Sequence, residues 1–436
     1  MHVSFLGGAR EVGRSAILLE TDKRILLDCG IKLYGETSYP APVAKQQYGG
    51  ARYQTPAPKK PQGDTSYPVP FAEKPHLAVI THAHLDHSGF IPAVFERYGT
   101  KFLGTPPTQA LSSLLIEDSM RLMKKVPYAE SSYNGAMNHF KTISYEKEYR
   151  IGNSRLILHD AGHIPGSSMV QLEHDGRRIV YTGDFKMEGT RMHNPTKPIE
   201  DTDVLITEST YFDKEHPDRE KLEREISEEI KETIDEGGNV LFPAFAVGRT
   251  QELIMAIRRW NRNVPIYTEG MSNEATSIML RFPEYIRDFH LFEEATSSVT
   301  KVTSRGKRKS VLSHPSVIIA SAGMLQGGSA IRYLTNLNNK SKVIFVGYCV
   351  EGTNGRRLID EGIVNIDGYE TRIRTPVMYM DLSAHAGRSD LFAFIKKCNP
   401  AKIFCVHGDN CDRFASELKD MGFDAIAPGI NDMFLV

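Results

Sequence analysis

Residues 81–90 read THAHLDHSGF, and this segment concentrates side chains that bind metal ions: His82, His84, Asp86 and His87. It follows the apolar run HLAVIT, so we expect a turn at the end of a strand. A polar strand face and an ordinary helix cap could also account for these residues. Imidazole and carboxylate are, however, the ligands that Zn²⁺ prefers outside thiolate sites, and the HxHxDH spacing favours two neighbouring metal ions.

Further histidines and acidic residues follow apolar runs elsewhere in the chain, in segments such as LLDCG, YTGDF and CVHGD. In layered α/β enzymes, functional residues gather beyond the ends of strands. Taken singly, each could be a turn residue, a helix cap or a core histidine. Together they place histidine or acidic residues at the ends of several expected strands, as in a layered α/β enzyme.

The elements that must position these residues follow a regular order. HVSFLGG, SAILLE and RILLDCG are typical of successive strands, and residues 107–126 of a helix with proline at its start. From about residue 210, a charged helix precedes GGNVLFPAFAVGRTQELIMAIRRW, which reads as strand, turn and helix of a parallel βαβ unit. We therefore predict an inserted α/β domain at 209–375, between a first part at 1–208 and a last part at 376–436.

The stretch from Tyr34 to Pro75 lacks periodicity and holds seven prolines between Pro40 and Pro70. It also carries tyrosines, whereas disordered linkers are poor in aromatic residues. We predict an ordered loop. Tyr34, Tyr39 and Tyr48 could stack on unpaired bases or could pack on the protein's own surface.

Composition sets the protein class. A chain of 436 residues with 25% charged residues and a net charge of −1 predicts about two soluble domains without a global basic field. The five cysteines form no CxxC pair, which favours a reducing compartment. The sequence shows no signal peptide and no apolar run of roughly 20 residues, so we expect a cytoplasmic protein that does not span a membrane.

In order along the chain, Asp28 in LLDCG, THAHLDH, His163 in AGHIPGSS and Asp184 in YTGDF resemble the four motifs of the metallo-β-lactamase superfamily. TEST, SAHAGRSD and CVHGD resemble motifs A, B and C of its β-CASP branch. GGAREVGRS, AFAVGRTQEL and ASAGMLQGG are similar to ribonucleases related to the cleavage and polyadenylation specificity factor, with RNase J as a further relative. The resemblance implies an αββα metallo-β-lactamase sandwich with an inserted α/β β-CASP domain.

The resemblance also implies roles for the candidate residues. Two zinc ions, with Mn²⁺ as an alternative, would lie about 3.5–4 Å apart and share an attacking hydroxide. Catalytic roles fall to Asp28 beneath the ligands, to Asp86, and to His385 as a general acid oriented by Glu208. The implied ligands are His82, His84 and His163 for one ion, Asp86, His87 and His407 for the other, and Asp184 as the bridge.

The implied activity is hydrolysis of phosphodiester bonds in single-stranded RNA, because RNA-acting members share a histidine in motif C, here His407. We favour 5′→3′ exonuclease action over a purely endonucleolytic RNA 3′-end processing enzyme. A scaffold subunit without catalysis is disfavoured because no ligand is lost. A hydrolase of small esters or thioesters is disfavoured by the inserted domain.

Several residues could contact RNA, each with a structural alternative. Lys307 and Arg308 lie in the basic run SRGKRK, which could track phosphates or be a solvated loop. Ser321 and Gly323 could form a phosphate-binding nest or serve strand–helix packing. Arg249 could bind phosphate at a helix start or form a salt bridge. A homodimer is possible, and the C-terminal run DMFLV could contribute to its interface.

Overall fold

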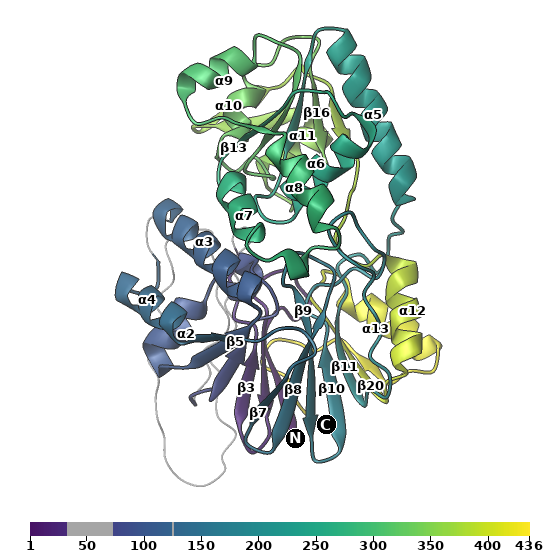
Figure 1. Cartoon of the computed structure of the whole chain (residues 1–436). Coiled ribbons are helices and arrows are strands. Elements are labelled where there is room, and N and C mark those ends of the chain that lie inside the picture. The colour runs from purple at the N-terminus through teal and green to yellow at the C-terminus, as the bar shows by residue number, and fades with distance from the viewer. Residues whose placement is uncertain (33–72, 124–125) are drawn as a thin grey trace.

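A computed structural model describes residues 1–32, 73–123 and 126–436 (Figure 1). The predicted ordered loop, with Tyr34, Tyr39 and Tyr48, lies outside the described residues except at its last positions. Across the described ranges, no helix combines the length and apolarity needed to cross a membrane.

Two seven-stranded sheets face each other in the lower part of the molecule (Figure 1). Their inner faces meet in one apolar layer that includes the Phe5 and Phe404 rings, whose centroids are 5.1 Å apart. The first sheet has the order β22 (Met433–Leu435), β1 (His2–Gly7), β2 (Ala16–Glu20), β3 (Arg24–Leu27), β4 (Leu77–Val79), β5 (Lys101–Gly104), β6 (Phe140–Thr142). The second has the order β21 (Ala425–Ile426), β20 (Lys402–Val406), β11 (Val204–Glu208), β10 (Arg177–Tyr181), β9 (Ser168–His174), β8 (Ser154–Asp160), β7 (Glu148–Ile151).

Helices cover the outer faces of both sheets, which completes the predicted αββα sandwich. The helices near the first sheet are α1 (Leu85–Ser88), α2 (Ile91–Tyr98), α3 (Pro106–Leu122) and α4 (Glu130–Asn138), and those on the second are α12 (Arg388–Cys398) and α13 (Cys411–Asp420). Helix α3 begins where Thr105 accepts a hydrogen bond from the backbone N–H of Thr108, with proline in the first turn. It ends at Leu122, before the predicted bound of 126.

A six-stranded parallel sheet forms the core of the inserted domain, at the top of Figure 1. Its order is β14 (Thr300–Lys301), β13 (Ile266–Glu269), β15 (Ser316–Ala320), β12 (Asn239–Pro243), β16 (Lys342–Phe345), β19 (Val377–Tyr379). Strand β12 is buried on both faces, with Val240 and Phe242 in one apolar cluster and Leu241 in another. Since β19 pairs with β16, the inserted sheet continues past the predicted boundary at 375.

Short helices and one hairpin complete the inserted domain. They are α5 (Arg219–Asp235), α6 (Arg249–Trp260), α7 (Ser272–Met279), η1 (Pro283–Tyr285), α8 (Phe289–Ser297), α9 (Arg305–Val311), α10 (Ala330–Leu334), α11 (Asn354–Glu361), β17 (Ile363–Ile366) and β18 (Tyr369–Arg372). The basic run SRGKRK forms most of α9 and its cap, where Ser304 accepts from the N–H of Lys307. The run is therefore largely solvent-exposed, as the alternative expected, but it forms a helix and not a loop.

Strand direction brings the candidate residues to one edge of the sandwich. Strands β10, β11 and β20 are parallel neighbours, and β8 runs in the same direction because both β8 and β10 are antiparallel to β9. Strands β3 and β4 are parallel in the facing sheet. The carboxyl ends of these strands face the inserted domain, and the predicted catalytic segments follow them directly.

Candidate metal centre

The histidine turn is held by backbone contacts with two loops, one that precedes β2 and one that follows β3. The N–H of Ser15 donates to the carbonyl of Asp86 over 2.8 Å, and the N–H of Cys29 donates to the carbonyl of His87 over 2.8 Å. Gly30 permits this approach, because a Cβ atom there would lie 1.6 Å from the carbonyl oxygen of Asp86. These backbone contacts fix the position of the turn.

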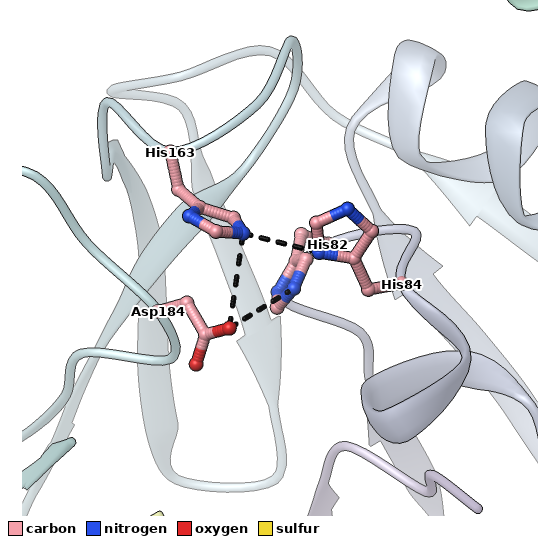
Figure 2. Close-up of side chains that lie close together, drawn as sticks. All are labelled: His82, His84, His163 and Asp184. Carbon is pink, nitrogen blue, oxygen red and sulfur yellow. Dashed lines mark hydrogen bonds and ion pairs between the residues drawn. The ribbon is translucent and has the colours of Figure 1, made fainter. Parts of the chain in front are cut away.

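One set of candidate ligands consists of His82, His84, His163 and Asp184 (Figure 2). Nε2 of His163 lies 3.1 Å from Nδ1 of His84 and 3.7 Å from Oδ2 of Asp184. Nε2 of His82 lies 3.5 Å from the same carboxylate oxygen. All four potential donor atoms lie within 4.8 Å of one another, which is the convergence that a metal ion requires.

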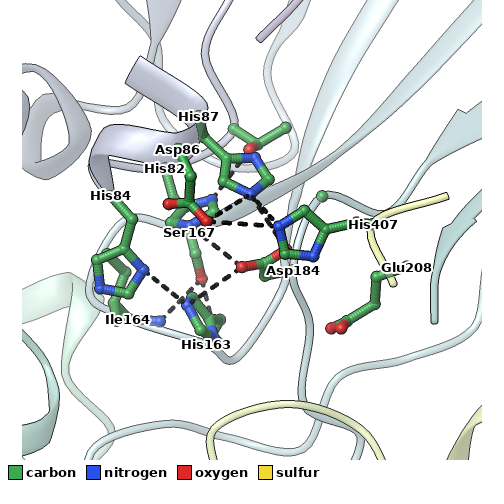
Figure 3. Close-up of polar contacts among 12 residues, drawn as sticks. His82, His84, Asp86, His87, His163, Ile164, Ser167, Asp184, Glu208 and His407 are labelled. Atoms are coloured by element: carbon green, nitrogen blue, oxygen red, sulfur yellow. Dashed lines mark hydrogen bonds and ion pairs between the residues drawn. The ribbon is translucent and has the colours of Figure 1, made fainter. Parts of the chain in front are cut away.

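The second set consists of Asp86, His87, Asp184 and His407 (Figure 3). Nε2 of His407 lies 3.3 Å from Nε2 of His87 and 3.4 Å from Oδ2 of Asp86. Oδ1 of Asp184 lies 3.3 Å from His87 Nε2 and 3.4 Å from His407 Nδ1. The two oxygens of Asp184 therefore face different sets of histidines.

Two ring nitrogens that point away from the cluster have protein partners. Nδ1 of His163 lies 3.0 Å from the carbonyl oxygen of Ala384, and a carbonyl can only accept, so this nitrogen carries the proton. Nδ1 of His87 lies 2.7 Å from Oδ2 of Asp28. In each neutral ring the remaining nitrogen keeps its lone pair directed into the cluster, as a metal ligand requires.

Asp28 is the hub beneath the second set. Its carboxylate is fully buried and accepts from the N–H of Thr81 over 2.7 Å, from the Thr81 hydroxyl over 2.9 Å and from the Tyr181 hydroxyl over 2.9 Å. The Thr81 oxygen also lies 3.1 Å from Nδ1 of His82. Asp28 therefore supports one histidine directly and another through Thr81.

Burial and neighbouring negative charge shift the pKa values of the histidines in opposite directions. Burial lowers the pKa of His82, His84 and His163, which keeps these rings neutral. Burial would also lower the pKa of His87, but the carboxylates of Asp184 and Asp28 raise it well above its usual value. The carboxylates around the second set thus favour positive charge at that position.

The donor set fits metal ions. Nε2 of His82 and Oδ1 of Asp184 are buried and have no hydrogen-bond partner among the described residues, although buried polar atoms are nearly always satisfied. The side chains that face the two sets are imidazoles and carboxylates, and no lysine or arginine pairs with Asp86 or Asp184 among the described ion pairs. Cations at both sets would satisfy these atoms and balance the buried charge.

Glu208 and His385 form a separate pair beside the cluster. Nδ1 of His385 donates to Glu208 Oε2 over 2.9 Å, and the opposite nitrogen lies 4.0 Å from Oδ2 of Asp184. Glu208 is itself fixed, because its Oε1 accepts from the N–H of Phe185 over 2.8 Å. Burial alone would lower the pKa of His385, but Glu208 and Asp184 raise it to about 9. These carboxylates therefore favour the protonated imidazole, the form that can donate a proton.

The residues predicted to contact RNA have varied surroundings. Arg249 is committed to a backbone contact, since its Nη1 donates to the carbonyl of Leu382. Arg308 pairs with both oxygens of Glu269, which accounts for this residue structurally. Lys307 is exposed, and its ammonium group donates to the carbonyl of Lys301 over 2.7 Å.

Ser321 and Gly323 follow the end of β15. The carbonyl of Ser321 accepts from the Ser329 hydroxyl over 3.1 Å and from the N–H of Ala330 over 2.9 Å. Gly323 suits close packing, because a Cβ atom there would lie 3.0 Å from the backbone nitrogen of Phe245. The alternative of close packing thus accounts for Gly323, and phosphate binding by this loop stays a prediction.

Sequence reasoning missed Thr81 and Tyr181 as partners of Asp28. Thr81 immediately precedes the first histidine, and Tyr181 ends β10 three residues before Asp184. Their adjacency to the motifs is the one signal that could have identified them.

Three family profiles match successive parts of the chain. The metallo-beta-lactamase superfamily matches residues 71–222, the Beta-Casp domain matches 250–358, and the Zn-dependent metallo-hydrolase RNA specificity domain matches 370–428.

Similar proteins match over nearly the whole chain. "Probable RNase MJ4" of Methanocaldococcus jannaschii is 34% identical and covers 99% of both chains. "RNase aCSPSF2" of Saccharolobus solfataricus is 33% identical over 98% of this chain and 83% of its own. "Transcription termination factor FttA" of M. jannaschii is 36% identical over 96% and 69%. A crystal structure of a protein of unknown function from Enterococcus faecalis V583 shares the fold, with a TM-score of 0.62, 14% identity and coverage of 100% and 99%.

Proposed function

Because the chain belongs to the β-CASP ribonuclease family of the metallo-β-lactamase superfamily, we propose that it is a zinc-dependent ribonuclease acting on single-stranded RNA. Relatives named as ribonucleases, one aligned over 99% of both chains, support this substrate. The profile described as an RNA specificity domain, matched at 370–428, supports it further.

The proposal rests on the position of the Asp184 carboxylate, whose two oxygens face different sets of histidines. One oxygen lies 3.5 Å from a nitrogen of His82, and the other lies 3.3 Å from a nitrogen of His87. A carboxylate shared in this way suits two adjacent cations, each completed by three further side chains. The proposed ligands are His82, His84 and His163 for one zinc, Asp86, His87 and His407 for the other, and Asp184 for both. Mn²⁺ is the alternative ion.

Zinc ions at these sets would supply a water of lowered pKa and positive charge opposite the phosphoryl oxygens. The chain's own residues orient the ligands and supply the proton for the leaving group. Asp28 holds the His87 ring through the 2.7 Å hydrogen bond to Nδ1. Glu208 keeps the His385 ring protonated and oriented, and this ring would give its Nε2 proton to the leaving 3′-oxygen of ribose.

The central test combines metal content with RNA cleavage. Asp184→Asn and His84→Ala are purified alongside the parent, zinc and manganese are measured by mass spectrometry, and cleavage of a labelled single-stranded RNA is followed. We expect about two equivalents of metal in the parent, reduced metal in both variants, and rates lowered by about 10³-fold or more. Cleavage by His84→Ala at the parental rate would overturn the catalytic assignment.

We favour 5′→3′ exonuclease action, with internal cleavage as the alternative. The loop that carries Ser321 and Gly323 would bind a 5′-monophosphate in this proposal. The test is a time course with two RNAs, one 5′-monophosphorylated and one with a 5′-hydroxyl, each labelled at the 3′ end. Progressive shortening of only the phosphorylated RNA supports the exonuclease, and equal internal cleavage of both excludes it.

A further inference from the structure

Phe245 is the only exposed residue in a buried stretch of the inserted domain. It follows β12 in the turn that leads to α6, and 36% of its surface is exposed. Its neighbours Ala244 and Ala246 are only 1% and 6% exposed. This aromatic ring in an otherwise packed turn is therefore available for contact with a ligand.

The Phe245 ring lies against glycine backbone at the ends of the two strands that flank β12. A Cβ atom at Gly323, after β15, would lie 3.3 Å from Cδ2 of the ring. A Cβ atom at Gly347, after β16, would lie 3.7 Å from Cε2. With hydrogen in place of side chains, the strand ends support the ring without covering it. The Phe245 ring is therefore positioned by the segments that follow β15 and β16 and stays exposed to solvent.

The same turn contacts two segments that carry residues of the candidate metal centre and its neighbouring acid. Gly248 packs against Ile164, next to His163, so closely that a Cβ atom at Gly248 would lie 2.5 Å from Cγ2 of Ile164. One residue later, Arg249 donates to the carbonyl of Leu382, in the segment that leads to His385. The turn is thus anchored to neighbours of both a candidate zinc ligand and the candidate acid.

Partly buried Tyr348 follows Gly347 and continues this aromatic surface toward the site. Its ring centroid lies 6.1 Å from that of Tyr211, and the Tyr211 centroid lies 5.9 Å from that of His385. The exposed Phe245 ring and the proton donor are therefore linked through glycine backbone and the ring contacts of Tyr348 and Tyr211.

We propose that Phe245 stacks on a nucleobase of the RNA strand next to the cleaved phosphodiester. The inference rests on the proposed ribonuclease function and adds a base-binding position to it. Phenylalanine has no hydrogen-bonding group, so the contact would accept any base, since every base offers a π-face. It would place the strand relative to the metal centre and would not select a sequence.

The test pairs protein variants with abasic RNA. The parent, Phe245→Ala, Phe245→Tyr and the control Tyr369→Ala are compared on single-stranded RNAs that each lack one base at a defined distance from the cleaved bond. Tyr369 is 78% exposed on β18 and lies outside the site, which makes it a matched exposed aromatic. The measurement is kcat/KM, with thermal melting of each metal-loaded protein to verify folding.

With intact RNA we expect Phe245→Ala to lower kcat/KM by about tenfold, Phe245→Tyr to retain it, and Tyr369→Ala to match the parent. At one abasic position the parent should lose about the same factor, and Phe245→Ala should lose nothing more there. Independent, multiplying losses at every position would overturn the stacking contact while leaving the ribonuclease proposal intact. Absence of RNA cleavage by the metal-loaded parent would overturn both.

Discussion

Nδ1 of His87 donates a 2.7 Å hydrogen bond to Oδ2 of Asp28, and both side chains are fully buried. Because that oxygen also accepts from the hydroxyls of Thr81 and Tyr181, the carboxylate is held in one orientation. The negative charge makes the opposite nitrogen of His87 a stronger ligand and fixes where it points.

Asp28→Asn should weaken metal binding at the second set about 10- to 100-fold, because the amide would place an N–H₂ group against these donors or leave them unpaired. Zinc content measured across a series of free-zinc buffers checks this. Asp420→Asn, at an exposed position on α13, is the control and should bind as the parent does. An unchanged zinc affinity in Asp28→Asn would contradict the supporting role.

Glu208→Gln should shift the alkaline limb of the pH–rate profile to lower pH. A general acid works when protonated, so activity falls as pH rises through the pKa of His385. Glu208 and Asp184 raise that pKa to about 9, and removal of the Glu208 charge lowers it. Profiles of kcat/KM from pH 6 to 10 measure the shift. Glu293→Gln, exposed on α8, should leave the profile in place; a profile of Glu208→Gln that coincides with the parent's would rule out this acid.

Metal removal should destabilise the folded chain. Without cations the partly buried carboxylate of Asp86 and the buried carboxylate of Asp184 face only histidines, some of which must then bind protons. At metal concentrations 100 times the dissociation constant, each site would contribute about 2.7 kcal/mol to stability. Calorimetry should therefore show a lower Tm after chelation and recovery on addition of zinc. An unchanged Tm would argue against resident ions.

Gly183→Ala should destabilise the protein more than Gly176→Ala does. Both glycines have positive φ, 52° and 76°, so alanine is strained by about 1 kcal/mol at either. At Gly176 nothing lies within 4 Å of the added methyl, whereas at Gly183 it would lie 2.9 Å from Thr81. The difference in urea-unfolding free energy reports this crowding beneath Asp184. Equal losses would show that the strand end relaxes freely.

The ligand cluster could be predicted because its residues lie after apolar runs, in motifs that resemble those of metallo-β-lactamases and their β-CASP branch. His82, His84 and Asp86 are close in sequence, and strand direction then forces the distant members to the same edge. The two sheets and the inserted parallel sheet follow from the same alternation of apolar runs and helices.

The supporting residues could not be predicted in this way. Tyr181 resembles any strand tyrosine until the facing sheet brings Asp28 to 2.9 Å from its hydroxyl. Arg308 lies in a basic run, but its partner Glu269 is contributed by a strand 39 positions earlier. Phe245 has the character of a core residue, and only the glycines of two neighbouring strands leave it exposed.

The pairing of Asp86 with His407, separated by 321 positions, also has a consequence for the order of synthesis. As the chain grows from its N-terminus, His407 is the last of the candidate ligands to be made, after the whole inserted domain. A nascent chain therefore lacks a complete second metal set until that domain has emerged. Under the proposed function, a chain that stops before His407 would lack one ligand of the second metal set.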